Sequence, residues 1–109
     1  MFGLKDSIIV DIKNILSKYN EIEKTVIFGS RAREDYKKTS DIDIAIFAEN
    51  ITSTRLNLLR NDFDELDIIY TVDVVDFYRL TKEELKNNIR NQAIIIFSRK
   101  EAGCSQTPL

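Results

Sequence analysis

The chain has 109 residues, of which 16 are Lys or Arg and 18 are Asp or Glu, with no histidine and a formal net charge of -2. One domain is expected at this length, and a hydrophobic content of 43% favours a packed core over disorder. The lack of histidine excludes Ser-His-Asp and Cys-His catalysis and the usual His/Cys zinc sites. The slightly acidic balance does not indicate direct nucleic-acid binding.

Cysteine usage and hydropathy bear on the compartment. The lone Cys104 excludes an intramolecular disulfide and suits a reducing environment. No apolar run approaches the ~20 residues of a membrane span, and the first residues lack the basic start and apolar stretch of a signal peptide. We therefore expect a cytoplasmic protein that has no membrane partner.

The first half of the chain predicts one helix and two strands. Apolar residues recur at helical spacing over residues 4–19, which indicates an amphipathic helix. A short buried strand over residues 25–28 then ends at Gly29-Ser30. The polar stretch 31–40 has room for one helical turn, and period-two alternation predicts a strand over residues 41–47.

The second half repeats this alternation of helices and strands. Thr52 or Ser53 can cap a second amphipathic helix, and the apolar, β-branched run 68–75 predicts a third strand. Residues 81–84 (TKEE) have the pattern of a capping box that opens another helix. Residues 93–97 (AIIIF) predict a last short strand.

These elements define the expected fold class. Alternating helices and strands indicate a single α/β (α+β) domain over residues 1–97, a short mixed sheet with helices packed on it. Residues 98–109 are polar, with Gly103 and Pro108, and are expected to form a C-terminal tail. Because the 41–47 strand alternates polar and apolar residues, one face of the sheet is expected to be open.

Carboxylates on the predicted strands are the strongest chemical signal. Asp41 and Asp43 are two residues apart, so both side chains leave the same face of a strand while the intervening isoleucines enter the core. Carboxylates held so close repel each other unless a cation lies between them. The pair alone is compatible with a site for a hard metal ion or with a solvated strand end.

Asp73 favours the metal site. It lies within the apolar run 70–75, where an unpaired charge would be costly to bury. If the third strand lies beside the second, Asp73 can share a face with Asp41 and Asp43, and an all-oxygen ligand set suits Mg²⁺ or Mn²⁺. The alternative is an ion pair of Asp73 with Arg79 or Arg99.

Gly29-Ser30 predicts a phosphate-binding turn, although such pairs also occur in ordinary turns. A glycine lets the backbone approach a ligand closely, and the amides at the start of a helix attract phosphate. Residues 30–40 are net basic, whereas residues 61–76 carry only acidic charge. Cations suited to phosphate and carboxylates suited to metal together indicate a metal–triphosphate ligand.

Three segments carry a family resemblance: residues 26–33 (VIFGSRAR), 40–46 (SDIDIAI) and 72–77 (VDVVDF). They resemble the minimal nucleotidyltransferases of the DNA polymerase β superfamily, whose pattern is Gly-Ser, a gap of about ten residues, Asp-hydrophobic-Asp and a later lone carboxylate. The resemblance extends to about residue 97. It departs at Glu34, where many relatives have glycine, which is expected to change how closely this loop approaches the phosphates.

The resemblance implies a role for each matching residue. Gly29, Ser30 and Arg33 would bind the nucleoside triphosphate. The metal ligands and catalytic residues would be Asp41, Asp43 and Asp73, holding two Mg²⁺ ions, with Mn²⁺ as a substitute. Asp76, at the expected end of the strand, is the weaker choice for the third ligand. The implied reaction transfers a nucleoside monophosphate from ATP, or another NTP, to a hydroxyl.

The resemblance also suggests the acceptor. Small proteins of this kind resemble the MNT antitoxin of toxin–antitoxin modules, which adenylylates a tyrosine of a HEPN RNase toxin with ATP. We expect the same activity and partner here; a homo-oligomer is compatible with this expectation. Two alternatives are a catalytically silent antitoxin that acts by binding alone, and a transferase acting on the hydroxyl of a small molecule such as an aminoglycoside.

Overall fold

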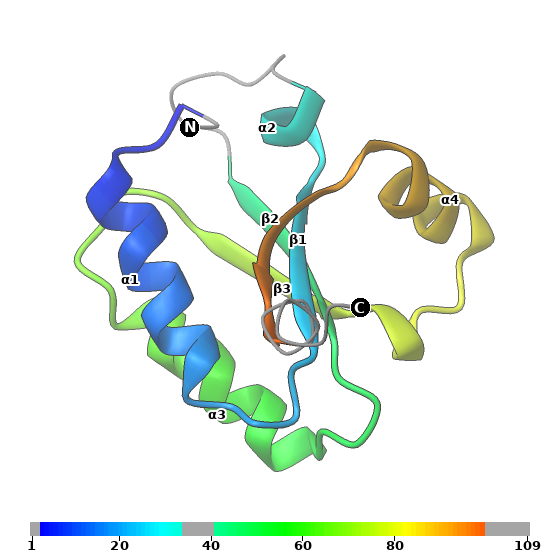
Figure 1. Cartoon of the computed structure of the whole chain (residues 1–109), viewed down its shortest axis with the longest axis horizontal. Helices are drawn as coiled ribbons and strands as arrows, with labels where there is room; N and C mark the ends of the chain where they lie inside the picture. Colours follow the sequence, from blue (N-terminus) through cyan, green and yellow to red (C-terminus); the bar gives the residue numbers. More distant parts are fainter. Residues whose placement is uncertain (1–2, 34–40, 100–109) are drawn as a thin grey trace, which may run out of the picture.

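The computed structural model describes residues 3–33 and 41–99 (Figure 1). In chain order its elements are α1 (Asp6–Ser17), β1 (Lys24–Phe28), α2 (Ser30–Arg33), β2 (Ile42–Phe47), α3 (Ser53–Asp64), β3 (Val72–Asp76), the 3-10 turn η1 (Phe77–Arg79), α4 (Glu83–Gln92) and β4 (Ile94–Ser98). Within these ranges, none of the helices has the length and apolar character that a bilayer span requires.

The four strands form one mixed sheet in the order β3-β2-β1-β4. β1 is antiparallel to both of its neighbours, β2 and β4, whereas β2 and β3 are parallel. Parallel neighbours need a crossover connection, and α3 provides it. The expected mixed sheet with packed helices is therefore confirmed.

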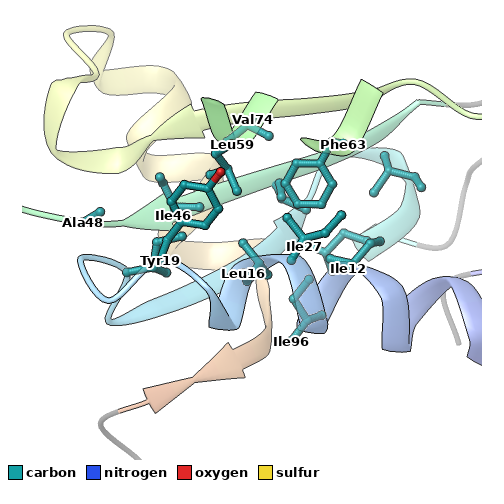
Figure 2. Close-up of a cluster of buried hydrophobic side chains, with 14 of the residues drawn as sticks. Ile12, Leu16, Tyr19, Ile27, Ile46, Ala48, Leu59, Phe63, Val74 and Ile96 are labelled. Carbon is teal, nitrogen blue, oxygen red and sulfur yellow. The ribbon is translucent and has the colours of Figure 1, made fainter. Parts of the chain in front are cut away.

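Helices α1 and α3 cover one face of the sheet, as the arrangement in Figure 1 shows. The apolar stripe of α1, including Ile12 and Leu16, packs with Leu59 and Phe63 of α3 against the inward-facing side chains of the strands (Figure 2). The isoleucines of β2, two of which flank Asp43, enter this core. Burial of this face fixes which side of β2 carries Asp43.

Helix α4 lies on the opposite face of the sheet (Figure 1). Its Ile89 packs on Val26 of β1 and Ala45 of β2. Near the end of β2, Phe47 stacks on Phe77 with a ring-centroid distance of 4.6 Å. Asp73 of β3 is exposed and Asp43 of β2 is half-buried. The face expected to be open is therefore covered in part by α4, and the carboxylates lie beyond its apolar cluster.

Two sequence expectations need correction. The strand expected over residues 68–75 is shorter at its start, because β3 pairs with β2 only from Val72, opposite Ile42. The capping box expected at residues 81–84 does not form, because α4 begins at Glu83 and its N-cap, Lys82, makes no side-chain capping bond. At α3, by contrast, Thr52 is the N-cap and accepts a hydrogen bond from the Arg55 amide (3.1 Å).

At the C-terminal end, β4 continues to Ser98, one residue beyond the expected strand. The backbone amide of Arg99 donates a hydrogen bond to the Glu23 carbonyl (2.8 Å), so the chain stays attached to the sheet at this point. The rest of the predicted tail, including Cys104, lies outside the described residues.

Candidate active site

The register of the parallel strands places two carboxylates side by side. Asp43 of β2 pairs directly with Asp73 of β3, so the two side chains leave the same face of neighbouring strands. Asp41 lies just before β2 begins at Ile42 and is exposed. The third strand therefore lies beside the second, which is the arrangement on which the sequence argument for Asp73 depended.

The electrostatics of Asp43 show that the three carboxylates interact. Burial raises the pKa of Asp43, and the charges of Asp73 and Asp41 raise it further. Arg31 and Arg33 act in the opposite direction and stabilise the ionised form. Asp43 thus carries an unfavourable charge in the protein alone, which is the condition that a bound cation relieves.

The turn after β1 lies directly against Asp43. Gly29 has a φ of +75°, a left-handed conformation that side chains other than that of glycine rarely adopt. A Cβ atom at this position would lie 2.6 Å from Oδ2 of Asp43. Glycine is therefore required here both by the backbone conformation and by the carboxylate that occupies the space.

The predicted helical turn after Gly29 is α2, which begins at Ser30. Both the Ala32 and the Arg33 amides donate hydrogen bonds to the Gly29 carbonyl (3.1 Å each). Arg33 is exposed and donates a long hydrogen bond to Oε1 of Gln92, at the end of α4 (3.4 Å). Gly29, Ser30 and Arg33 are thus gathered at the end of β1 that adjoins Asp43.

Arg31 is a further candidate site residue, which the sequence pattern does not single out from the basic residues around it. Its side chain is buried, with only 1% of the residue exposed, and its guanidinium lies 4.6 Å from the ring centroid of Tyr70. Its charge also reaches Asp43. The only signal in the sequence is its place directly after Gly29-Ser30, and nothing local predicts burial of a cation.

The arginine pairings considered for Asp73 are not among its contacts. Arg79 pairs instead with Asp76 (3.5 Å) and donates a hydrogen bond to the Ile51 carbonyl. Arg99 donates to the carbonyls of Ser17, Tyr19 and Ile22. These interactions of both arginines therefore link neighbouring segments of the fold and do not involve Asp73.

Asp76 has a structural role at the end of β3. Its carboxylate accepts a hydrogen bond from the Tyr78 amide (3.1 Å) and caps η1. Burial raises the pKa of Asp76, while the Tyr78 amide, Arg79 and the Ala48 amide oppose this shift. Successive side chains of a strand point to alternate faces. Asp76 is three residues after Asp73, so the two carboxylates leave opposite faces of β3.

The donor set suits a hard divalent cation, although it is not a closed cage. Asp41, Asp43 and Asp73 offer only oxygen ligands, as Mg²⁺ prefers. Within residues 3–33 and 41–99, no three acidic, Cys or His side chains are already spaced to hold a metal ion by themselves. Mg²⁺ in nucleotide sites is commonly held by one or two carboxylates together with substrate phosphates and water, so the residues present fit that mode.

The rest of the predicted basic loop lies outside the described residues. Glu34, Lys37 and Lys38 lie between the described ranges. The basic charge identified here is therefore that of Arg31 and Arg33.

Sequence comparison identifies the family. The profile of the family described as "Polymerase beta, Nucleotidyltransferase" matches residues 10–102. The chain is 35% identical to MJ1217 of Methanocaldococcus jannaschii, over 77% of this chain and 86% of that protein. It is 30% identical to MntA of Haemophilus influenzae, over 85% and 82% of the two chains. Both relatives are provisionally named protein adenylyltransferases.

Solved structures agree with the fold. An antitoxin-containing crystal structure described as a toxin–antitoxin with AMP-PNP superposes with a TM-score of 0.68 at 22% identity, covering 86% of this chain and 76% of the other. A complex of tri-AMPylated Shewanella oneidensis HEPN toxin with MNT antitoxin gives a TM-score of 0.59 at 20% identity, with 94% and 77% covered. Together with the sequence matches, these results place the chain in the polymerase β nucleotidyltransferase family, among its minimal members, as an enzyme of a family that generally uses divalent metal ions.

Proposed function

We propose that the chain transfers AMP from ATP to a tyrosine hydroxyl of a HEPN-type RNase toxin and thereby acts as its antitoxin. The observation that carries the proposal is the pairing of Asp43 with Asp73 beside Gly29, whose missing Cβ leaves room for the Asp43 carboxylate. The relatives named as adenylyltransferases and the HEPN complexes among the structural neighbours support the choice of reaction and partner.

Each site residue has a physical role in this proposal. The amides and hydroxyl of the Gly29-Ser30 turn bind the triphosphate. The exposed Arg33 adds a positive charge that can pair with phosphate oxygens. Asp41, Asp43 and Asp73 hold divalent ions, with two Mg²⁺ ions expected and Mn²⁺ as a substitute. When bound, such ions neutralise charge on the phosphates and make a hydroxyl more acidic.

The chain's own contribution to the reaction is alignment. The turn at Gly29 follows β1, and Asp43 and Asp73 lie on β2 and β3 of the same sheet, so the sheet brings the turn and the carboxylates to one region. An acceptor hydroxyl placed in line with the α-phosphorus would form the new P–O bond and lose its proton to water, as the bond from the α-phosphorus to the leaving pyrophosphate breaks. Positioning and electrostatic stabilisation then supply the rate enhancement.

The test is transfer of radiolabel from ATP labelled at the α-phosphate, in the presence of MgCl₂ and the product of the neighbouring reading frame. We expect label on that protein, located on a tyrosine by mass spectrometry, and its loss on addition of EDTA. Asp41→Asn and Asp43→Asn should each reduce transfer by at least about 100-fold, a loss comparable to removing one strong electrostatic contribution to catalysis.

Other outcomes would contradict the proposal. If Asp41→Asn and Asp43→Asn neutralise the toxin fully without any labelling, the chain is an antitoxin that acts by binding alone. Labelling of an aminoglycoside without a protein partner would instead identify a small-molecule acceptor. The mutual repulsion of three carboxylates argues against the silent alternative, because a site without cations gains nothing from holding them together.

A further inference from the structure

Arg31 has an environment that phosphate binding alone does not explain. A guanidinium taken out of water is costly unless charges and hydrogen bonds compensate for the lost hydration. At 1% exposed, Arg31 is far less accessible than Arg33, two residues later, which is exposed. Its side chain is directed into the protein and is not presented to solvent where a nucleotide would arrive.

Arg31 belongs to one segment of the site, contacts a second and acts electrostatically on a third. It belongs to α2, directly after the Gly29-Ser30 turn. Its guanidinium lies over the ring of Tyr70, in the segment that leads into β3 and Asp73. Its charge also acts on the Asp43 carboxylate of β2.

The segment beneath the guanidinium is itself attached to β2. The Thr71 carbonyl, next to Tyr70, accepts a hydrogen bond from the Ile42 amide (2.8 Å). A displacement of Tyr70 would therefore be transmitted to the start of both carboxylate-bearing strands. A planar guanidinium can stack on an aromatic ring and face a carboxylate at the same time, whereas the compact ammonium group of lysine lacks this planar surface.

We propose that Arg31 is a positioning residue whose guanidinium, held on the Tyr70 ring, fixes the Gly29-Ser30 turn relative to Asp43 and Asp73. The inference rests on the proposed function, since it assumes that the turn binds phosphate and the carboxylates bind metal. Arg31 itself does not touch the nucleotide. It acts by keeping the phosphate-binding turn aligned with the metal-binding carboxylates. Metal and nucleotide then assist each other's binding only while Arg31 holds this alignment.

The experiment measures the coupling between metal binding and nucleotide binding. Isothermal titration calorimetry gives the affinity of the full chain for ATP in EDTA and in excess MgCl₂, and the ratio of the two affinities is the coupling between metal and nucleotide. Binding couplings in proteins are typically about 5- to 150-fold. We expect the wild-type ratio to lie in this range and Arg31→Met to lower it by at least about fivefold.

Conservative variants separate alignment from simple stabilisation. Tyr70→Phe keeps the ring and should retain the wild-type ratio, whereas Tyr70→Leu and Arg31→Lys should each lower it, because each loses one side of the stack. The matched control is Arg55→Met, since Arg55 of α3 stacks on Tyr19 at the same 4.6 Å, but Tyr19 lies in the segment between α1 and β1. This variant should lower the melting temperature and leave the ratio unchanged.

The possible failures are distinct. If wild-type protein shows no coupling between Mg²⁺ and ATP, the proposed function is wrong. A second outcome is that wild-type protein couples Mg²⁺ and ATP binding, and the variants Tyr70→Leu, Arg31→Lys and any folded Arg31→Met keep the wild-type ratio of affinities. In that case the site assignment stands and the role given to Arg31 is wrong. An equal loss of coupling in Arg55→Met would also overturn it, because the effect would then follow from stability alone.

Discussion

Gly29 combines two constraints at a single residue. Its positive φ lies in the turn between β1 and α2, and the Asp43 carboxylate occupies the space where a Cβ would lie. The first constraint is common to many turns, whereas the second arises only because β1 and β2 are neighbours with Phe28 paired to Asp43. The Gly-Ser pair in the sequence could indicate the turn, but the contact with Asp43 depends on the folded sheet.

Gly29→Ala should therefore damage the site more than the fold. A left-handed alanine costs about 1–2 kcal/mol, and the new methyl group also displaces Asp43. We expect loss of ATP binding in MgCl₂ by calorimetry, together with a lower free energy of unfolding in urea. Gly3→Ala is the matched control, because Gly3 has a nearly identical φ of +73°. ATP binding by Gly29→Ala at the wild-type level would contradict the assigned geometry.

Asp43 is expected to lower stability in the protein without ligands. Because burial and the neighbouring carboxylates raise its pKa, the native state holds this proton at pH values where the unfolded chain has lost it. Stability therefore falls as pH rises from the ordinary carboxyl range through the raised pKa, and remains lower above it.

Asp43→Asn should remove this loss. The variant is expected to melt above wild type at pH 7, with each kcal/mol gained appearing as roughly 4–8 °C for a small domain, and to approach wild type near pH 3. It should also lose the increase in melting temperature that MgCl₂ with ATP gives the wild type. Thermal unfolding followed by circular dichroism at several pH values measures both effects. A variant that is less stable than wild type at pH 7 would contradict the account.

At the scale of elements, a polar cluster connects the segment after α1 to α3 beside the apolar core. The hydroxyl of Tyr19 donates to Asp62 (2.6 Å), and its ring lies beneath the guanidinium of Arg55. Arg55 in turn donates two hydrogen bonds to the carboxylate of Glu21 (2.7 and 3.0 Å). This arrangement lowers the pKa of Glu21, chiefly through the hydrogen bonds from Arg55.

The same cluster predicts a loss of stability in alkali. Burial, with further contributions from Asp62, raises the pKa of Tyr19 to about 12 from an ordinary value of 10.0. Between these values the unfolded chain releases the tyrosine proton while the native state retains it, so stability falls as pH rises from about 10 to about 12. Part of the measured alkaline slope should therefore belong to Tyr19.

Tyr19→Phe tests this contribution. Losing a hydrogen bond to a charged group should cost about 1.5–3 kcal/mol at pH 7, and the decline of stability between about pH 10 and 12 should become shallower than in wild type. Urea unfolding at a series of pH values gives both quantities. Asp62→Asn keeps the hydroxyl but removes the negative charge, so it should produce an intermediate slope. An alkaline slope unchanged in Tyr19→Phe would exclude the assignment.

The elements also show which predictions sequence patterns support. The stripe that predicted α1 and the alternation that predicted β2 both arise from burial against one face, so the pattern can be read locally. The start of β3 cannot be predicted from a local pattern, because Ile68 and Tyr70 pack on the core without pairing in the sheet. The strand begins only at Val72, where β2 supplies a partner.

Prediction of the site followed the same division. Asp41, Asp43, Asp73 and the Gly29-Ser30 turn form recognisable sequence patterns, and the structure brings them to one region. The sequence does not single out Arg31, because its buried position against Tyr70 involves a residue distant in sequence. The functions assigned to all these site residues remain predictions, which the experiments above test.

At the scale of the whole molecule, the main hydrophobic core and the candidate site carboxylates lie on opposite faces of the sheet. One face is covered by α1 and α3 and carries the main core, as Figures 1 and 2 show. The other face carries the smaller cluster around α4 and, on β2 and β3, the carboxylates Asp43 and Asp73. The core thus anchors the strands from behind while their other side chains remain available.

The parallel pairing of β2 and β3 also has a consequence for biosynthesis. A growing polypeptide that has emerged only as far as α3 already contains Asp41 and Asp43 but not their partner from β3. On the proposed assignment, a nascent chain cannot become competent to consume ATP until the crossover has closed and the last carboxylate has docked. Catalytic competence would then arise only after β3 has been synthesised and has paired with β2.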